Sequence, residues 1–394
     1  MPEIAEVESA RRLVASECIG RVIEDVICHE QGGGPRDSLF DEIVIRATSA
    51  SEFKAALIGR TLVEASRVGK IQCLKTSEES LFVTVHFGMT GAWSVRGRPG
   101  VQYKRYSVDT TAWPPKFCKL ELCFSGGIRL ALTDPRRLAR VNLIRAVNPR
   151  SVLPLSALGP DAYLALPSAS ILASVFSTKS CAIKALLLDQ TFIAGVGNWV
   201  ADEVLYQARI HPETLASALR TDDTNRLHAA LTYVITLACE CDADHTRFPT
   251  EWLFHYRWGK GKGTDSKMPD GSAITFITVG GRTSAIVVKV QGTPRKVLKQ
   301  EKSAEVGAGG AGETTSAYFT TATVEPLEPV KKTKKKVSEP QVVISATSTT
   351  STTTTTAATS KKKRSRAPSS VSVPSVSSLT ATTSRRRLAP PPTK

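Results

Sequence analysis

The chain has 394 residues, and its 52 lysines and arginines outnumber its 36 aspartates and glutamates, giving a net charge of +16. A basic balance favours an anionic partner. Residues 301–394 alone hold 15 basic and 6 acidic residues, so more than half of the excess lies outside the first 300 residues. Apolar runs stay far below the roughly 18 residues of a transmembrane helix, so we expect no membrane span.

The eight cysteines are scattered along the chain, and no two of them form a CxxC pair. The N-terminus is charged and polar, unlike a secretory signal. This pattern favours reduced thiols in an intracellular protein over a disulfide-stabilised secreted one.

The first half of the chain is typical of a helix followed by a β-sandwich. Residues 2–16 have apolar side chains at helical spacing. Alternating patterns typical of strands follow in residues 22–28, 60–96 and 119–132, the last of these a hairpin around Ser125-Gly126-Gly127. A Gly-rich break occupies residues 31–35. Regularly spaced strands of this kind predict a sandwich flanked by helices.

The second half changes character. Residues 148–167 contain several prolines and are predicted to form a linker, and residues 168–242 are predicted to be helical. Leu186, Leu187 and Leu188 are expected to lie within one helix, and two further helices are expected at Trp199–Ile210 and Asp222–Cys241. A return to β structure over 246–291 ends in a hairpin, with strands at 273–280 and 283–291 around Gly280-Gly281-Arg282. The fold class is therefore α+β, with domains at 1–147, 168–245 and 246–291, joined by the linker and followed by a tail at 292–394.

The tail is of low complexity, and residues 348–360 consist only of Ser, Thr and Ala. Basic clusters stand at residues 331–336, 361–366 and 385–387. So little apolar surface cannot offset the entropy of ordering a chain, so we expect disorder. The clusters are typical of nuclear-targeting signals, of non-specific DNA-binding arms or of a merely solvated tail; the nuclear signal is the simplest interpretation.

The chain begins Met1-Pro2-Glu3-Ile4-Ala5-Glu6-Val7-Glu8. Removal of Met1 would leave Pro2 as a terminal secondary amine, and an α-amino group titrates near pH 8, so part of it is neutral at cell pH. Such an amine attacks an aldehyde carbon to give an iminium, which serves as an electron sink. Glu3 and Glu6 are three residues apart and can share one helix face. Ordinary helix capping is the competing interpretation.

Residues 187–203, LLDQTFIAGVGNWVADE, form the strongest motif. The pattern predicts a helix, two turns and a second helix, in which Gly195 and Gly197 permit positive φ and close backbone approach. Asn198 would stand at the N-terminus of the second helix, where free amides and the helix dipole favour a phosphate. Asn198 can equally be a plain N-cap.

The N-terminal octapeptide and this motif, which continues through Leu205–Pro212, resemble the formamidopyrimidine-DNA glycosylase (Fpg/Nei) family of DNA repair enzymes. The resemblance covers residues 2 to about 291 and implies the helix–two-turns–helix fold of that family. It implies that Pro2 is the nucleophile, that Glu3 is the general acid and that Glu6 orients the nucleotide or shuttles protons. It also implies phosphate contacts for Lys70 and Asn198.

Four further positions take their expected role from the same resemblance. Met89, in His86-Phe87-Gly88-Met89-Thr90-Gly91, is expected to fill the gap left by an extruded base, with core packing as the alternative. In Thr133-Asp134-Pro135-Arg136-Arg137-Leu138, Arg136 is expected to face the orphaned partner base and Arg137 to lie near phosphate. Leu138 stands where the family usually has phenylalanine and is expected to be a weaker wedge.

Arg282 and Lys184 complete the expected DNA contacts: Arg282 on the last hairpin, and Lys184 beside Asn198. Many bacterial relatives carry a zinc finger at this hairpin. Here no cysteine follows Cys241, and structural zinc needs four ligands, so the resemblance implies a zincless finger of the plant kind. Cys239, Cys241 and His245 have the wrong spacing for a metal cluster.

The expected function is a bifunctional DNA glycosylase and AP lyase that excises oxidised purines from double-stranded DNA, with no cofactor or metal and as a nuclear monomer. Two alternatives remain open. One is an endonuclease VIII-like preference for oxidised pyrimidines, and the other is a non-catalytic protein that binds damaged DNA. Intact Pro2, Glu3 and Lys70 favour an enzyme over the latter.

Overall fold

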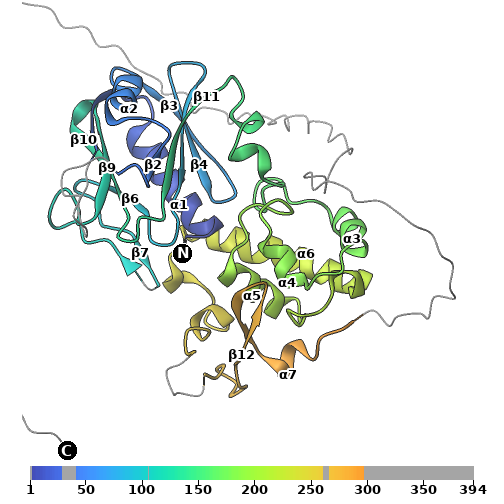
Figure 1. Ribbon diagram of the computed structural model, residues 1–394. Helices are drawn as coiled ribbons and strands as arrows, with labels where there is room; N and C mark the ends of the chain where they lie inside the picture. The colour runs from blue at the N-terminus through green and yellow to red at the C-terminus, as the bar shows by residue number, and fades with distance from the viewer. Residues whose placement is uncertain (1, 29–40, 105, 261–265, 297–394) are drawn as a thin grey trace, which may run out of the picture. The chain divides into compact units, whose positions relative to one another are not determined.

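The computed structural model describes residues 2–28, 41–104, 106–260 and 266–296 (Figure 1). The chain divides into two units at Val324, and all the described residues lie in the first. The predicted Gly-rich break at 31–35 and the basic clusters of the tail lie outside the described residues.

The helices of the described residues are α1 (Ile4–Cys18), α2 (Ala50–Leu57), α3 (Ala169–Ser177), α4 (Ile183–Leu188), α5 (Asn198–Gln207), α6 (Thr221–Glu240) and α7 (Val288–Gln291). The strands before the helical region are β1 (Ile23–Cys28), β2 (Ile45–Arg46), β3 (Leu62–Val68), β4 (Ile71–Thr76), β5 (Leu81–His86), β6 (Ala92–Val95), β7 (Gln102–Tyr103), β8 (Tyr106–Ser107), β9 (Cys118–Phe124), β10 (Ile128–Thr133) and β11 (Arg140–Arg145). The strands after it are β12 (Thr275–Val279) and β13 (Arg282–Ile286).

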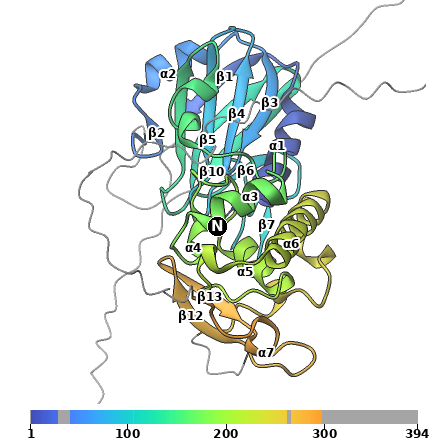
Figure 2. The ribbon, with the colours of Figure 1, turned by 90° about the vertical axis from the view of Figure 1, so that its right-hand side faces the viewer.

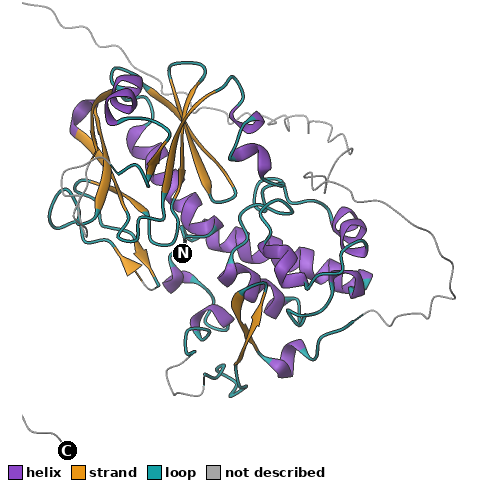
Figure 3. Ribbon diagram, in the orientation of Figure 1, coloured by secondary structure: helices purple, strands orange, loops and turns teal. Residues whose placement is uncertain are grey.

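Two sheets enclose the first core. One has the order β1-β9-β10-β6 and the other β2-β11-β5-β4-β3, and β11–β2 is a parallel pair among otherwise antiparallel neighbours. Figure 3 shows the strands of these sheets in orange. Leu81, Val83 and Val85 alternate along β5 and are all buried in one apolar cluster, which also contains Leu120 and Leu130 of the opposite sheet. The alternation predicted for residues 60–96 therefore places one face of β5 in the core.

The outer face of the same sheet is covered as well. Phe82, Ile71 and Ile144 pack with Leu155, which belongs to the segment predicted as a linker. Val152 and Leu158 of that segment pack against the same cluster. Residues 152–158 thus lay apolar side chains over the five-stranded sheet.

Helix α1 joins two cores. Ile4 and Ala5 belong to the apolar cluster of the helical region, whereas Val7, Ala10 and Val14 belong to that of the sandwich. Contacts of α1 reach β3 and β4 in one sheet, β6 and β10 in the other, and α6. The N-terminus is therefore held where the sandwich meets the helices (Figure 1).

The helical region has its own core, and α6 illustrates how sequence produces it. Leu227, Leu231, Val234 and Ala238 recur at helical spacing and are all buried. Figure 2 shows α4, α5 and α6 between the sheets and the β12–β13 hairpin, and α5 contacts β13. The predicted helices 199–210 and 222–241 agree with α5 and α6 to within a few residues. The expected α+β class, with sheets first and helices after them, is confirmed.

The region predicted as β over 246–291 is mostly irregular, which corrects that prediction. In the described parts of this region, residues 246–260 and 266–291, the strands are β12 and β13, and residues 288–291 form the short helix α7 instead of extending the second strand. The side chain of Gln291 explains the turn: its Oε1 accepts the Val287 N–H at 2.9 Å, and its Nε2 donates to Ile210 O at 3.0 Å. These hydrogen bonds stabilise a helical turn where the alternating valines had predicted a strand.

Helix α2 was not predicted, although its sequence carries a start signal. Ser49 caps it, with the Ser49 hydroxyl accepting the Glu52 N–H at 3.2 Å and the Glu52 carboxylate accepting the Ser49 N–H at 2.9 Å. This reciprocal capping box is readable in the sequence as S-x-x-E. No helix in the described part of the chain is long and apolar enough to cross a membrane. All eight cysteines are free thiols.

Candidate active site

The start of α1 is buried against the start of α5. Glu3 is only 2% exposed, and Pro2 before it is also buried. The carboxylate of Glu3 accepts hydrogen bonds from the Trp199 N–H at 3.0 Å and the Val200 N–H at 3.1 Å. First-turn amides have no partner inside their own helix, and the helix dipole favours a negative charge there. The N-terminus of α5 therefore fixes the position of Glu3.

Two glycines permit this approach. A Cβ on Gly197 would lie 2.5 Å from Cγ of Glu3, and one on Gly195 would lie 2.5 Å from Cδ1 of Ile4. Gly195 has the predicted positive φ, at 110°, but Gly197 has a φ of −119° that any residue can adopt. Gly197 is therefore required for space and not for its backbone conformation.

Glu6 lies one turn further along α1. Its Oε2 accepts the Glu3 N–H at 2.9 Å, and its Oε1 accepts the indole N–H of Trp199 at 3.1 Å. Burial, and then the nearby charge of Glu3, raise the pKa of Glu6 to about 7. A carboxyl group with such a pKa can carry a proton near neutral pH, as an acid–base catalyst must.

Lys70 lies in the turn between β3 and β4. Its side chain reaches the loop of residues 189–197 between α4 and α5, called the two-turn loop. Its Nζ donates to Val196 O at 2.9 Å. Gly69 beside it has a φ of 55°, and a Cβ there would lie 2.7 Å from Cβ of Ala194. Burial lowers the pKa of Lys70, while the charges of Glu3 and Glu6 oppose that shift. Lys70 is thus placed beside both glutamates.

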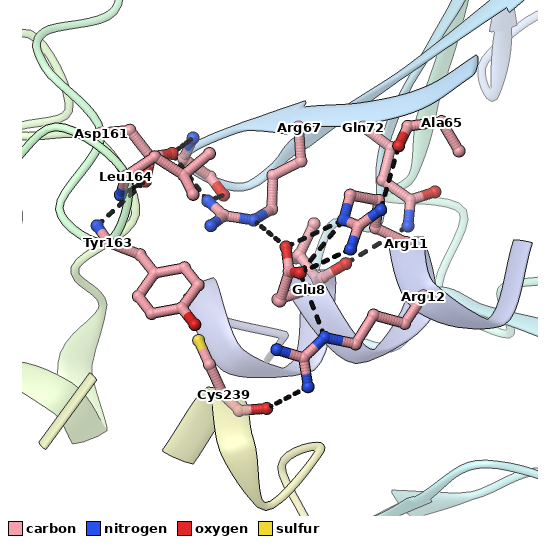
Figure 4. Close-up of polar contacts among 12 residues, drawn as sticks. Glu8, Arg11, Arg12, Ala65, Arg67, Gln72, Asp161, Tyr163, Leu164 and Cys239 are labelled. Carbon is pink, nitrogen blue, oxygen red and sulfur yellow. Dashed lines mark hydrogen bonds and ion pairs between the residues drawn. The ribbon is translucent and has the colours of Figure 1, made fainter. Parts of the chain in front are cut away.

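A buried ionic network behind α1 holds this turn in place (Figure 4). Arg67, at the end of β3, donates to Glu8 Oε2 at 2.9 Å and to Asp161 Oδ2 at 2.6 Å. The same Asp161 oxygen accepts the Gly69 N–H at 2.6 Å. Arg11 and Arg12 pair with Glu8 from the solvent side. The turn that carries Lys70 is therefore tied both to α1 and to the segment of Asp161.

A cavity of about 390 Å³ opens beside these groups. Several of the residues singled out in the sequence line it, and these are Glu3, Glu6, Met89, Arg136, Asn198 and Arg282. They come from α1 and its N-cap, from two loops of the sandwich, from α5 and from β13. Segments from both ends of the described chain therefore contribute to one site.

Sequence reasoning missed further residues of the cavity wall, which include Tyr103, Lys104, Tyr106, His245, Arg257 and Trp258. A signal was present, because residues 103–106 and 254–258 interleave aromatic and basic side chains. Such interleaving is typical of surfaces that bind nucleic acid.

Asn198 is the first residue of α5, and Gly197 occupies the cap position, so the alternative of a plain N-cap is wrong. Its Nδ2 donates to Thr283 O on β13 at 3.0 Å. Its Oδ1 is buried without a hydrogen-bond partner in the described residues. Asn198 thereby joins α5 to the hairpin that carries the exposed Arg282.

Lys184 does not fit the expected phosphate contact. It is fully buried, and its Nζ lies 2.5 Å from Asp202 Oδ1 and 2.6 Å from Ser284 Oγ. Asp202 also pairs with Arg257 at 2.5 Å and accepts the Ala285 N–H at 3.1 Å. Lys184 therefore anchors the hairpin on α5, and its charge is already neutralised inside the protein.

The loop after β10 places its three predicted residues differently. Arg136 is exposed at the cavity, and Leu138 is 37% exposed. Arg137 instead forms a two-pronged ion pair with buried Asp41, at 2.9 and 3.0 Å, from a φ of 54°. A guanidinium paired in this way has a structural role, so the expected phosphate contact by Arg137 does not fit the structure.

The residues of the hairpin region do not fit a structural zinc ion. No cysteine follows Cys241 in the chain, and no group of three or more His, Cys, Asp or Glu side chains suitable for a metal occurs in residues 2–28, 41–104, 106–260 and 266–296. The hairpin packs instead on an apolar cluster whose buried members are Leu253, Met268, Ile274, Ala285 and Val287.

Comparison with protein families identifies two matching regions. Residues 1–141 match the formamidopyrimidine-DNA glycosylase N-terminal domain, and residues 158–250 match the formamidopyrimidine-DNA glycosylase H2TH domain. Together they contain Glu3, Glu6, Lys70 and Asn198.

Individual relatives agree with the family match. A formamidopyrimidine-DNA glycosylase of Arabidopsis thaliana is 42% identical over 292 residues, which are 74% of this chain and 71% of that protein. One from Halalkalibacterium halodurans is 31% identical over 238 residues, covering 60% of this chain and 78% of that protein.

Solved structures share the fold. The MutM (Fpg) protein of Thermus thermophilus has a TM-score of 0.56 at 26% identity, and the match covers 75% of this chain and all of that one. The Lactococcus lactis Fpg, solved with DNA that contains an AP site, has a TM-score of 0.58 at 23% identity over 74% of this chain and all of that one. The chain therefore belongs to the formamidopyrimidine-DNA glycosylase family.

Proposed function

We propose that this protein is a bifunctional glycosylase and AP lyase that removes oxidised purines from double-stranded DNA during base-excision repair. The observation that carries the proposal is the shared cavity, where Glu3 and Glu6 meet Asn198, Arg136 and Arg282. Carboxyl groups for proton transfer thus stand beside basic and amide groups suited to a kinked phosphate backbone. The L. lactis relatives, solved with AP-site DNA and with DNA containing FAPY-dG, support a substrate of this class.

The proposed chemistry starts at Pro2 after removal of Met1. The free electron pair of the proline nitrogen attacks C1′ of an extruded nucleotide, the C1′–O4′ bond breaks, and Glu3 gives its proton to O4′. The proton on the proline nitrogen then passes to the base, and the nitrogen's electron pair forms the iminium as the protonated base leaves C1′. The resulting iminium acidifies the C2′ hydrogen, so loss of that proton expels the 3′ phosphate. A second elimination expels the 5′ phosphate, and water then releases the proline amine. Apart from that water, the proposed steps use groups of this chain and the sugar's own carbonyl chemistry.

Reduction with borohydride tests the covalent step directly. Borohydride reduces the iminium to a stable amine, so incubation with AP-site DNA should give a protein–DNA adduct on a denaturing gel. Pro2→Gly and an N-terminally tagged protein should lose most of the adduct, because a primary or acylated nitrogen replaces the proline amine. Glu24→Gln, which changes an exposed carboxylate of β1, is the matched control and should form the adduct normally.

Mass spectrometry of the mature N-terminus completes the test. Active protein that retains Met1, or strand cleavage that survives acylation of the N-terminus, would contradict the mechanism. A panel of duplexes, each with one oxidised purine or pyrimidine, then decides between the proposed specificity and an endonuclease VIII-like one. Binding to all lesions without cleavage would favour the non-catalytic alternative.

Three further proposals concern the context of the enzyme. We propose a zincless finger, supported by the apolar cluster and by the Lys184–Asp202 anchor of the hairpin; one equivalent of co-purifying zinc would contradict it. We propose a nuclear location directed by the basic clusters of the tail, to be followed with a C-terminal fluorescent fusion that leaves Pro2 free. We propose a monomer, to be checked by light scattering.

A further inference from the structure

Asp134 lies fully buried between two loops of the sandwich. Its Oδ1 accepts the Thr90 hydroxyl at 2.8 Å and the Arg136 N–H at 3.2 Å. Its Oδ2 accepts the N–H groups of Leu138 and Ala139, both at 2.6 Å. A carboxylate offers about four acceptor positions, so this one is saturated.

These hydrogen bonds join the loop of residues 88–91, between β5 and β6, to the loop of residues 134–139, between β10 and β11. The two backbones also touch: a Cβ on Gly88 would lie 2.5 Å from the carbonyl oxygen of Leu138, and Gly88 has a φ of 62°. The first loop carries Met89 and the second carries Arg136 and Leu138. All three expected wedge residues therefore belong to one hydrogen-bonded unit.

The far side of the second loop is fixed as well. Arg137 holds a left-handed backbone conformation, which costs energy for a residue with a side chain, and its guanidinium is bound by buried Asp41. Lys119, also buried, lies 3.4 Å from the same Asp41 carboxylate. The loop is thus held at two points. Asp41 binds the Arg137 side chain, and Asp134 accepts the backbone N–H groups of Arg136 and Leu138, which flank Arg137.

We propose that Asp134 is a positioning residue that makes Met89, Arg136 and Leu138 enter a duplex as a single rigid wedge. The inference rests on the proposed function. Extruding a base from a duplex costs energy that inserted side chains must offset, and loosely held loops would lose entropy on insertion. A base in single-stranded DNA needs no extrusion from a duplex. The hydrogen bonds of Asp134 should therefore affect cleavage of duplex DNA and leave cleavage of single-stranded DNA unchanged.

Thr90→Val is the key variant, because it removes the hydroxyl that links the loops and leaves the other three bonds of Asp134 intact. Thr90→Ser keeps the hydroxyl and is the conservative rescue. Asp134→Asn is the stronger change, since an amide cannot accept all four bonds. Asp109→Asn is the matched control: Asp109 is exposed and accepts the Thr111 N–H and hydroxyl in a local turn.

The experiment measures strand cleavage of one oligonucleotide that contains a single oxidised purine, as a duplex and as a single strand, with kcat and KM determined separately. Thr90→Val should lower duplex cleavage about tenfold, because loosely held side chains offset less of the cost of extruding the base. Its cleavage of the single strand should stay close to wild type, and Thr90→Ser and Asp109→Asn should behave like wild type on both. An equal loss on both substrates, or no loss on either, would overturn the proposal.

Insertion is also measured without chemistry. A 2-aminopurine opposite a tetrahydrofuran site, which resists cleavage, should brighten when the wedge enters, and Thr90→Val and Asp134→Asn should reduce that rise. An unchanged rise in Thr90→Val would overturn the proposal even if Asp134→Asn fails to fold. If wild type gives the rise but cleaves neither substrate, the proposed lyase chemistry fails and the wedge proposal stands.

Discussion

Gly197 and the side chain of Glu3 are in such close contact that a Cβ on Gly197 would lie 2.5 Å from Cγ of Glu3. The contact places the carboxylate of the N-cap residue of α1 on the first amides of α5, 196 residues later in the chain. The position of Glu3 therefore depends on the absence of a side chain in the two-turn loop.

Gly197→Ala should displace Glu3 and remove most of the base-excision activity. The φ of −119° tolerates alanine, so the effect comes from the collision and not from the backbone. Displacement of Glu3, the proposed general acid, predicts a decrease in kcat of about 100-fold or more. Single-turnover excision from a lesion duplex measures it.

Gly127→Ala is the control for this substitution. Gly127 has a φ of 75° in the β9–β10 hairpin, with open space around an added Cβ. Alanine there should lower the free energy of unfolding by about 1 kcal/mol and leave excision unchanged. Equal activity of Gly197→Ala and wild type would contradict the role of the Glu3–Gly197 contact.

Glu6→Gln should make folding less sensitive to pH. The folded-state pKa of Glu6 is raised to about 7 from an ordinary value of 4.5, so folding becomes less favourable as pH rises through that window. Glutamine removes this dependence. Urea unfolding at pH 5 and pH 8 should therefore show that the mutant gains stability relative to wild type at the higher pH.

Part of the dependence should remain in Glu6→Gln, because burial also raises the pKa of Glu203 to about 7. Glutamine also loses one hydrogen bond, from Glu3 N or Trp199 Nε1, at a cost that is the same at both pH values. This cost cancels when the mutant's change in unfolding free energy at pH 5 is subtracted from that at pH 8. The same difference from wild type at pH 5 and pH 8 would show that Glu6 does not titrate in this range.

Lys184→Ala should destabilise the protein without changing its electrostatic contact with DNA. Removal of one partner from a buried ion pair costs about 3–5 kcal/mol. Lys184 is neutralised by Asp202, so the slope of log Kobs against log salt should not change. Thermal unfolding and binding at several salt concentrations give the two quantities.

Arg282→Ala is the counterpart of Lys184→Ala: it should change the salt dependence of DNA binding and leave stability nearly unchanged. Arg282 is exposed at the cavity, so its loss should leave stability nearly unchanged. One fewer phosphate contact should reduce the magnitude of the salt slope by about 0.9. A reduced slope in Lys184→Ala would restore the expectation of a direct phosphate contact there.

Asp161→Asn should weaken the support of the Lys70 turn. Asp161 is the buried partner of Arg67 and accepts the Gly69 N–H, so the expected cost is about 3 kcal/mol, with slower strand cleavage. Chemical denaturation and AP-site cleavage measure the two effects.

Asp242→Asn is the matched control. Asp242 pairs with Arg12 but is 54% exposed at its side chain, so loss of the pair should cost less than about 1 kcal/mol. Asparagine also tolerates the φ of 53° at this position. Equal losses for the two substitutions would mean that burial of the Arg67–Asp161 pair is unimportant.

The sequence alone was sufficient for features that depend on neighbouring residues. The apolar spacing of 222–241 predicted α6, and the pattern of 119–132 predicted the β9–β10 hairpin. The motif 187–203 predicted the helix, the turns and the helix that the structure contains. Helical periodicity, strand alternation and turn residues are local properties, so a single sequence carries them.

Only the tertiary structure decided which charged side chains remain available at the cavity. Arg136 and Arg137 are adjacent in sequence, yet Arg136 lines the cavity and Arg137 is bound to Asp41. Lys184 is likewise neutralised by Asp202. The partner of a charge is set by segments far apart in the chain, and burial makes that pairing obligatory because an unpaired buried charge is too costly. The chemistry proposed for the N-terminus therefore comes from residue types and the family resemblance, whereas the availability of the basic side chains depended on the fold.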